Sequence, residues 1–151
     1  HGEPPGDEAR VNYVAAAKWL RKAAEQDCVN AMNNLAFLYQ NGLGVKKDLS
    51  QALKWYGVAA QKGDAMAQAN LGLMYEDGAG VPSDLVIAYK WFTLSAEQGN
   101  VVGKHSFDDY NEHQRLTPKQ MAEARQMVAE FRAGRQADHA SFILQKPATA
   151  Q

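Results

Sequence analysis

Histidine and carboxylate side chains recur at a regular spacing in one short stretch of the chain. His105, Asp109 and His113 are each four residues apart, so a helix over this stretch would place them along one face. Imidazole and carboxylate groups at that spacing can share a divalent metal ion. The same pattern is also typical of a solvated polar helix face. We favour the second interpretation and predict no metal and no cofactor.

The other nucleophilic side chains form no recognisable catalytic set. Cys28 is the only cysteine, which excludes an intramolecular disulfide, and we expect it to pack or to cap a helix. His105 and His139 make no recognisable triad with Ser106 or Ser141. The sequence also lacks GxSxG, P-loop, HExxH and CxxC motifs. It therefore favours a non-enzymatic protein, with a hydrolase as the alternative.

Length and composition indicate one ordinary globular domain. The chain has 151 residues, of which 46% are hydrophobic and 22% are charged, and its formal net charge is -1. This balance gives no reason to expect nucleic acid or an anionic membrane as a partner. No apolar run approaches the roughly 20 residues that span a bilayer. The first ten residues do not resemble an intact signal peptide, which leaves cytoplasm, periplasm and export all open.

The dominant feature of the sequence is an internal repeat. Trp19, Trp55 and Trp91 stand 36 residues apart, and a lysine precedes each of them. Further positions recur at the same period on both sides of each tryptophan. They include Ala16, Ala52 and Ala88; Ala24, Ala60 and Ala96; and Leu35, Tyr39, Gly42, Gly44, Val45 and Asp48 with Leu71, Tyr75, Gly78, Gly80, Val81 and Asp84.

Each repeat is predicted to contain two helices. The first carries apolar residues at positions 31, 35, 36 and 39, and the second carries small or aromatic residues at 52, 55, 59 and 60, which in both cases is one helical face. The Gly-x-Gly between them permits a tight turn, and Asp48 stands at an N-cap position with Gln51 three residues later. We expect each tryptophan to fill the gap between closely packed helices. The sequence therefore predicts a solenoid, in which each pair packs on its neighbours.

This pattern resembles the Sel-1-like repeat (SLR) family, close kin of the tetratricopeptide repeats. Residues 67–99 match nearly every position of the family's consensus sequence. Residues 31–63 depart from that consensus mainly at Ala36, where glycine is usual. The resemblance covers residues 12–132 and implies an all-α, right-handed α/α superhelix. It also implies an interaction scaffold that holds a protein or peptide on a concave surface lined by the first helices. Some cysteine-rich secreted members have been linked to penicillin binding, but their paired cysteines are absent here.

The two ends depart from the repeat pattern. We predict a flexible segment over 1–11, a half repeat over 12–28, full repeats over 29–64 and 65–100, capping helices over 101–132 and a flexible tail over 133–151. The closing helix is expected to start with a capping box made by Thr117 and Gln120, with Pro118 as its first residue. The half repeat favours a fragment of a longer array over a stack that starts mid-repeat. Phe142, Ile143 and Leu144 form the one apolar cluster of the tail.

The predicted binding groove is the helical face opposite the core stripe. Its apolar centre is Phe37 and Leu73, and asparagines recur at its edge as either partner-binding groups or helix-to-helix hydrogen bonds. The predicted groove residues are Asn33, Asn34, Phe37, Gln40, Asn70, Leu73, Glu76, His105, Asp109 and Glu112, with Ala69 between them. The competing hypotheses are a small-molecule- or metal-dependent enzyme on the same scaffold, and an architectural segment of a longer scaffold.

Overall fold

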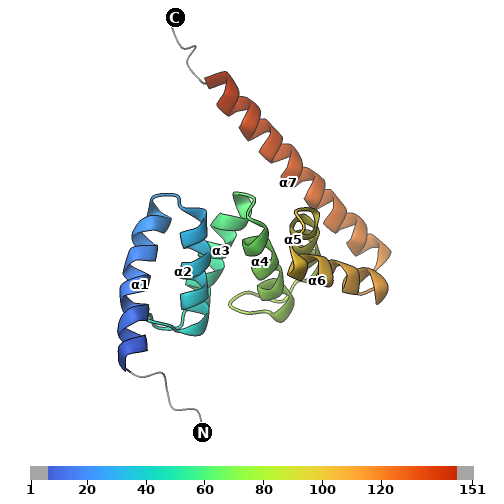
Figure 1. Ribbon diagram of the computed structural model, residues 1–151. Coiled ribbons are helices and arrows are strands. Elements are labelled where there is room, and N and C mark those ends of the chain that lie inside the picture. The colour runs from blue at the N-terminus through green and yellow to red at the C-terminus, as the bar shows by residue number, and fades with distance from the viewer. Residues whose placement is uncertain (1–6, 146–151) are drawn as a thin grey trace, which may run out of the picture.

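The computed structural model describes the backbone of residues 7–145 and the side chains of residues 9–135 (Figure 1). The regular secondary structure of this part of the chain is all α-helix, and its seven helices are joined by turns. They are α1 (Asp7–Glu25), α2 (Val29–Asn41), α3 (Leu49–Gln61), α4 (Ala65–Asp77), α5 (Leu85–Glu97), α6 (Val101–Glu112) and α7 (Pro118–Gln145). No described helix is long and apolar enough to span a membrane.

The helices stack in chain order from α1 to α6, and each packs against the next (Figure 1). We call α2, α4 and α6, the first helices of successive repeats, the A helices, and α1, α3 and α5 the B helices. The all-α solenoid predicted from the sequence is therefore confirmed. The last helix breaks the pattern, because α7 packs chiefly against α5 and then runs away from the stack.

Helix ends are fixed by the side chains that the repeat places there. The Asp48 carboxylate accepts a hydrogen bond from the Gln51 amide, and Asp64 and Asp84 cap α4 and α5 in the same way. Each such cap is worth about 1 kcal/mol. Gly42 ends α2 in the left-handed conformation at φ 65°. The predicted capping box of α7 is confirmed, because Gln120 Oε1 accepts from the Thr117 amide and Thr117 Oγ1 from the Gln120 amide.

Small residues and aromatic side chains make up much of the core. Ala52, Ala59 and Ala60 are fully buried, and so are Tyr56 and Phe92, the aromatic residues that directly follow Trp55 and Trp91. Phe92 lies against Gly72, where an added Cβ would stand 2.6 Å from the ring. This contact explains why the repeat over 65–100 has glycine at that position.

The prediction that every repeat tryptophan is a buried anchor is wrong. Trp91 is 4% exposed and Trp55 is half-buried, but Trp19 is 71% exposed. Trp91 lies in the groove between α3 and α5 with Leu53 and Tyr75, and it also meets Phe131 of α7. Burial of each indole therefore depends on the neighbouring helices that surround it.

Helical structure extends beyond both predicted limits of the repeat domain. Helix α1 begins at Asp7, inside the segment predicted to be flexible, and α7 continues through the predicted tail to Gln145. The physical reason is that residues 133–145 contain no proline and only one glycine, Gly134, so nothing stops the helix. The side chains of Phe142, Ile143 and Leu144 lie outside the described residues.

Candidate functional site: the outer face of the A helices

The A helices present equivalent outward positions at the 36-residue period. We call this surface the A-face. It consists of Asn30, Asn34, Phe37 and Asn41 on α2, Met66, Asn70, Leu73 and Asp77 on α4, and Val102, Ser106, Asp109 and His113 on α6 and its C-cap, all exposed or half-buried. The spacing within each helix is four, three and four residues, which keeps every member on one side of the helix.

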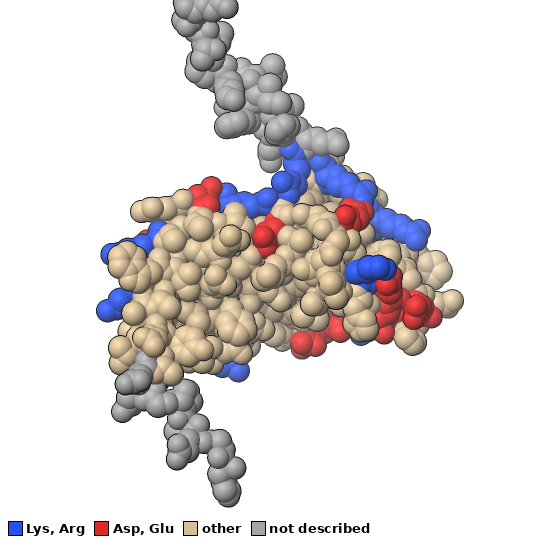
Figure 2. Space-filling view, viewed as in Figure 1, with Lys and Arg blue, Asp and Glu red and all other residues tan. Residues whose placement is uncertain are grey.

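The A-face has an apolar centre. Phe37 is 51% exposed, Met66 is 57% exposed and Val102 is 46% exposed, although each belongs to a helix whose opposite side is core. Leu73 is half-buried and packs against the core cluster around Tyr89. Figure 2 shows that the surface over α2 and α4 carries few charged groups. Apolar groups that remain exposed in this way are typical of interaction surfaces.

Asparagine amides border the apolar centre. Asn34 is exposed and Asn70, the equivalent residue one repeat later, is half-buried. Asn41 donates its side-chain amide to the Phe37 carbonyl oxygen at 2.9 Å, which holds it along the last turn of α2. Amides at this edge can donate to and accept from a peptide backbone.

A hydrogen-bonded network of charged side chains and Tyr110 lies beside the α6 end of the A-face. Tyr110 donates its hydroxyl to Glu76 Oε2 at 2.8 Å, and the Arg115 guanidinium donates to Glu76 at 3.3 Å and to Asp109 at 3.1 Å. The Arg115 guanidinium also lies over the Tyr110 ring, 4.3 Å from its centroid. Burial, together with the hydrogen bond to Glu76, raises the pKa of Tyr110, which therefore stays a hydrogen-bond donor.

Residues on the inner side of the predicted groove contact neighbouring helices. Asn33 is only 6% exposed and donates to Asp64 at 2.5 Å, and Ala69 is 1% exposed. Gln40 accepts from the Tyr56 hydroxyl at 3.2 Å, and Glu76 belongs to the network above. The reason is that an interior A helix is covered by neighbours on several sides, so its exposed stripe is narrower than the sequence pattern suggests.

Other predicted groove residues are exposed to different degrees. Asn34 and Phe37 are exposed, and Asn70, Leu73 and Asp109 are half-buried members of the A-face. His105 and Glu112 are exposed on α6, but they flank the A-face rather than belong to it.

Sequence reasoning missed Met66 and Val102. They stand 36 and 72 residues after Asn30, so the repeat alignment could have placed them on the same face. The alignment by itself does not reveal their exposure, because it compares residues with one another and not with the helices that cover them.

The histidine and carboxylate stretch is not assembled as a metal centre. Asp109 Oδ1 lies 3.1 Å from His113 Nδ1, but its other oxygen accepts from Arg115. Among the described residues, no three His, Cys, Asp or Glu side chains gather as a metal would require. Cys28 is the exposed N-cap residue of α2, and its side chain makes no capping hydrogen bond.

A family comparison accounts for the period and for the helix pairs. The family model described as Sel1 repeat matches residues 2–28, 29–64 and 65–100, which together are more than half of the chain. The chain belongs to the Sel1 repeat family. Proteins with these repeats generally serve as protein-protein interaction scaffolds and are typically non-enzymatic. No curated protein matches the chain.

Two solved structures share the Sel1 repeat fold with this chain. One is c5321, described as a protective antigen present in uropathogenic Escherichia coli strains and displaying an SLR fold, with 32% identity and a TM-score of 0.75. That match covers 91% of this chain but only 29% of c5321, so the chain spans less than a third of the length of that protein. The other is a Sel1 repeat protein from Oxalobacter formigenes, with 41% identity, a TM-score of 0.59, and coverage of 61% and 69% of the two chains.

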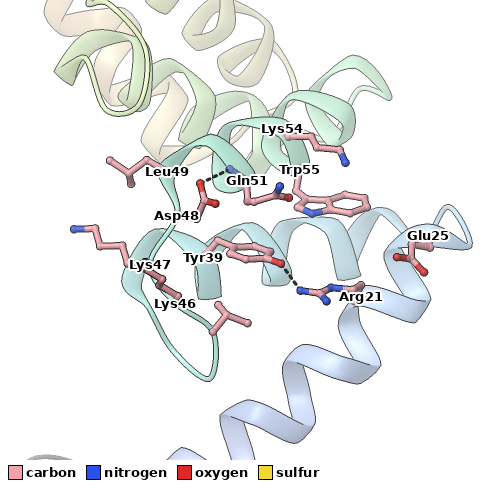
Figure 3. Close-up of a pocket in the computed structure, with 11 residues that line it drawn as sticks. Arg21, Glu25, Tyr39, Lys46, Lys47, Asp48, Leu49, Gln51, Lys54 and Trp55 are labelled. Atoms are coloured by element: carbon pink, nitrogen blue, oxygen red, sulfur yellow. Dashed lines mark hydrogen bonds between the residues drawn. The ribbon is translucent and has the colours of Figure 1, made fainter.

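The grooves between successive B helices of the Sel1 repeats differ in how they are filled. Between α1 and α3, Arg21 reaches from α1 to donate to the Tyr39 hydroxyl, and Trp55 lies across the same hollow (Figure 3). Between α3 and α5 the residue equivalent to Arg21 is Gly57, beside which an added Cβ would meet nothing within 4 Å. The second groove, about 710 Å³, is lined mainly by apolar side chains that include Leu53, Tyr75 and Trp91.

Proposed function

We propose that this Sel1 repeat chain is a non-enzymatic adaptor that binds a protein or peptide segment on the A-face. The observation that carries the proposal is the exposed apolar row of Phe37, Met66 and Val102, one from each A helix. Scaffold function is general for the repeat family, and the choice of this face is our own inference. It keeps the concave, A-helix side that the sequence predicts and moves the groove by one helical position.

The chemistry of the face favours a segment with apolar anchors and accessible backbone amides. Phe37 and Met66 offer uncharged contact area, since neither side chain is required to fill the core. Asn34 and Asn70 can fix the register of such a segment through hydrogen bonds to its backbone. Asp77 and Asp109 stand toward the α6 side, and they favour a ligand with a basic residue at that end.

The experiment is capture of partners from an extract of the native host, with wild-type chain and variants as bait. Phe37→Ala combined with Met66→Ala should reduce capture of the main partner at least about tenfold, as truncation of anchor residues does. Because both side chains are exposed, the melting curve and the helical circular dichroism should stay almost unchanged. Leu73 is unsuitable for this test, since it packs against the core.

The matched control is Val101→Ala, which removes a side chain that is 81% exposed on α6 but lies outside the A-face. It should leave capture intact. If the double variant retains the partner as well as wild type does, the A-face is not the binding surface. If purified chain turned over a substrate or carried a stoichiometric metal ion, the enzyme hypothesis would replace the adaptor.

A further inference from the structure

Helix α1 carries a second exposed apolar surface, on the other side of the stack. Val11 is 66% exposed, Val14 is 43% exposed and Trp19 is 71% exposed. With Arg10, Lys18 and Lys22 they line a hollow of about 660 Å³, and we call these six residues the α1 face. Val14, Lys18 and Trp19 stand three, seven and eight residues after Val11, which is the spacing of a single stripe along a helix.

The equivalent stripe on α5 shows what covers such a surface. Lys90 and Trp91 correspond to Lys18 and Trp19, and helix α7 lies over them. The Phe131 ring meets the Trp91 indole edge-on with centroids 5.5 Å apart, and Val128 of the same helix is 4% exposed. The repeat therefore already uses this face to dock an amphipathic helix.

The same helix also supplies a carboxylate to the half-buried lysine. Lys90 Nζ lies 4.3 Å from the Trp91 centroid, beneath α7. Burial lowers the pKa of Lys90, and the negative charge of Glu130 opposes this shift. Arg132 of α7 pairs with Glu97 on α5, which adds a second ionic contact across the two helices. An aromatic residue and an adjacent carboxylate are thus the chemistry that covers a Lys-Trp pair in this chain.

The middle B helix supplies the contrast, because its stripe is polar and no described helix covers it. The residues of α3 at the positions of Val14 and Lys18 are Ser50 and Lys54, and both are exposed. At the position of Val11 stands Lys47, just before α3, which is also exposed. At these positions the repeat over 29–64 has the polar residues Lys47 and Ser50, whereas α1 has Val11 and Val14.

We propose that the α1 face docks an amphipathic helix of a partner protein whose apolar stripe is bordered by aspartate or glutamate. The charged side chains that line the hollow are all cations, Arg10, Lys18 and Lys22, and Figure 2 shows Lys and Arg at the α1 end of the molecule. A partner with flanking carboxylates would neutralise them as its apolar residues cover Trp19. This surface is separate from the A-face, so the proposal does not depend on the function proposed above.

Two synthetic helical peptides test whether flanking carboxylates favour binding to the α1 face. Each has about 18 residues, a length at which a helix forms readily on a surface. They share one stripe of leucine and phenylalanine, and they differ only in the flanking residues, which are glutamate in one and lysine in the other. Fluorescence anisotropy of the labelled peptides with the full chain should give at least about tenfold tighter binding for the glutamate peptide. The difference should shrink as salt rises from about 0.05 to 0.5 M.

Variants of the α1 face connect the binding to its residues. Trp19→Ser should weaken binding of the glutamate peptide about tenfold or more, with unchanged circular dichroism, because the indole is exposed. Lys18→Glu with Lys22→Glu should reverse the preference toward the lysine peptide. Lys54→Glu, at the equivalent position of the polar α3 stripe, is the matched control and should leave the affinity unchanged.

Several results would overturn the proposal. The acidic helix is not the occupant if the two peptides bind with equal affinity or if neither binds. The same holds if Lys54→Glu changes the affinity as much as Lys18→Glu with Lys22→Glu does. A second copy would be the occupant if the mass by analytical ultracentrifugation rose with concentration in wild type but not in Trp19→Ser. Binding to vesicles of anionic phospholipid with the same dependence on Trp19, and no binding of the glutamate peptide, would identify a membrane surface instead.

Discussion

Helices α1 and α5 carry the same Lys-Trp pair in the same place of the repeat, yet the two tryptophans have opposite surroundings. Trp91 is buried beneath Phe131 of α7, whereas Trp19 is 71% exposed at the other end of the stack. The residues that directly follow them differ less, since Leu20 is half-buried and Phe92 is fully buried in the helix pair. The position of a residue in the repeat therefore determines the direction of its side chain. Whether that side chain is buried depends on the neighbouring helix.

The largest expected effect is the stability cost of removing Trp91. Trp91→Ala should lower the free energy of unfolding by about 3–5 kcal/mol, because it opens a cavity between α5 and α7. Trp55→Ala should cost less, since the indole is half-buried. Urea denaturation followed by circular dichroism measures both. Equal costs at positions 91 and 55 would contradict the view that α7 makes the difference.

Removing the cover should be less costly than removing the tryptophan. Phe131→Ala should destabilise the chain by about 2 kcal/mol, because Phe131 is itself only half-buried. It should also shift the tryptophan emission toward longer wavelengths, since the Trp91 indole gains contact with water. Val101→Ala, at a position of α6 that is 81% exposed, is a control that should change neither quantity. An unchanged emission maximum would mean that α7 does not shield Trp91 in solution.

A pH experiment tests how tightly the aromatic residue after the tryptophan is held. Burial raises the pKa of Tyr56 to about 12 from its ordinary value of 10.0. The stability gained from keeping this hydroxyl neutral is complete below pH 10 and is lost as pH rises through about 12, because the unfolded chain deprotonates first. At pH 11 the loss should be about 1 kcal/mol relative to about pH 8. In Tyr56→Phe the slope of unfolding free energy against pH should be smaller across this window; an unchanged slope would contradict the burial of the hydroxyl.

The smallest expected effect lies at the other end of the comparison. Trp19→Ala should change the free energy of unfolding by less than about 0.5 kcal/mol, as exposed substitutions usually do. Alanine is also the better helix former, which offsets the lost surface contacts. Differential scanning calorimetry of the full chain would measure the shift. A cost comparable to that of Trp91→Ala would show that the α1 face is covered in the free protein.

The repeat family, the helix pairs and their caps could be predicted from the sequence because they depend on local chemistry. Asp48 caps α3 and Gly42 ends α2 by contacts within a few residues of each, and the 36-residue period makes these signals recur. The alanine core of the B helices could also be predicted from the sequence, because small residues at helical spacing let two helix axes approach closely. The exposed positions of Asn34 and Phe37 followed from the same periodicity.

Only the tertiary structure decided which of the equivalent residues are covered. Asn33 is buried because the start of α4 lies against it. Trp91 is buried because Phe131 of α7 and the side chains of the groove between α3 and α5 surround it. Those contacts join residues about 30 or more positions apart, and no periodicity in one helix encodes them. The sequence by itself determined the repeating unit and the direction of its side chains. The neighbours across the stack determined burial, and with it the difference between a core residue and a binding surface.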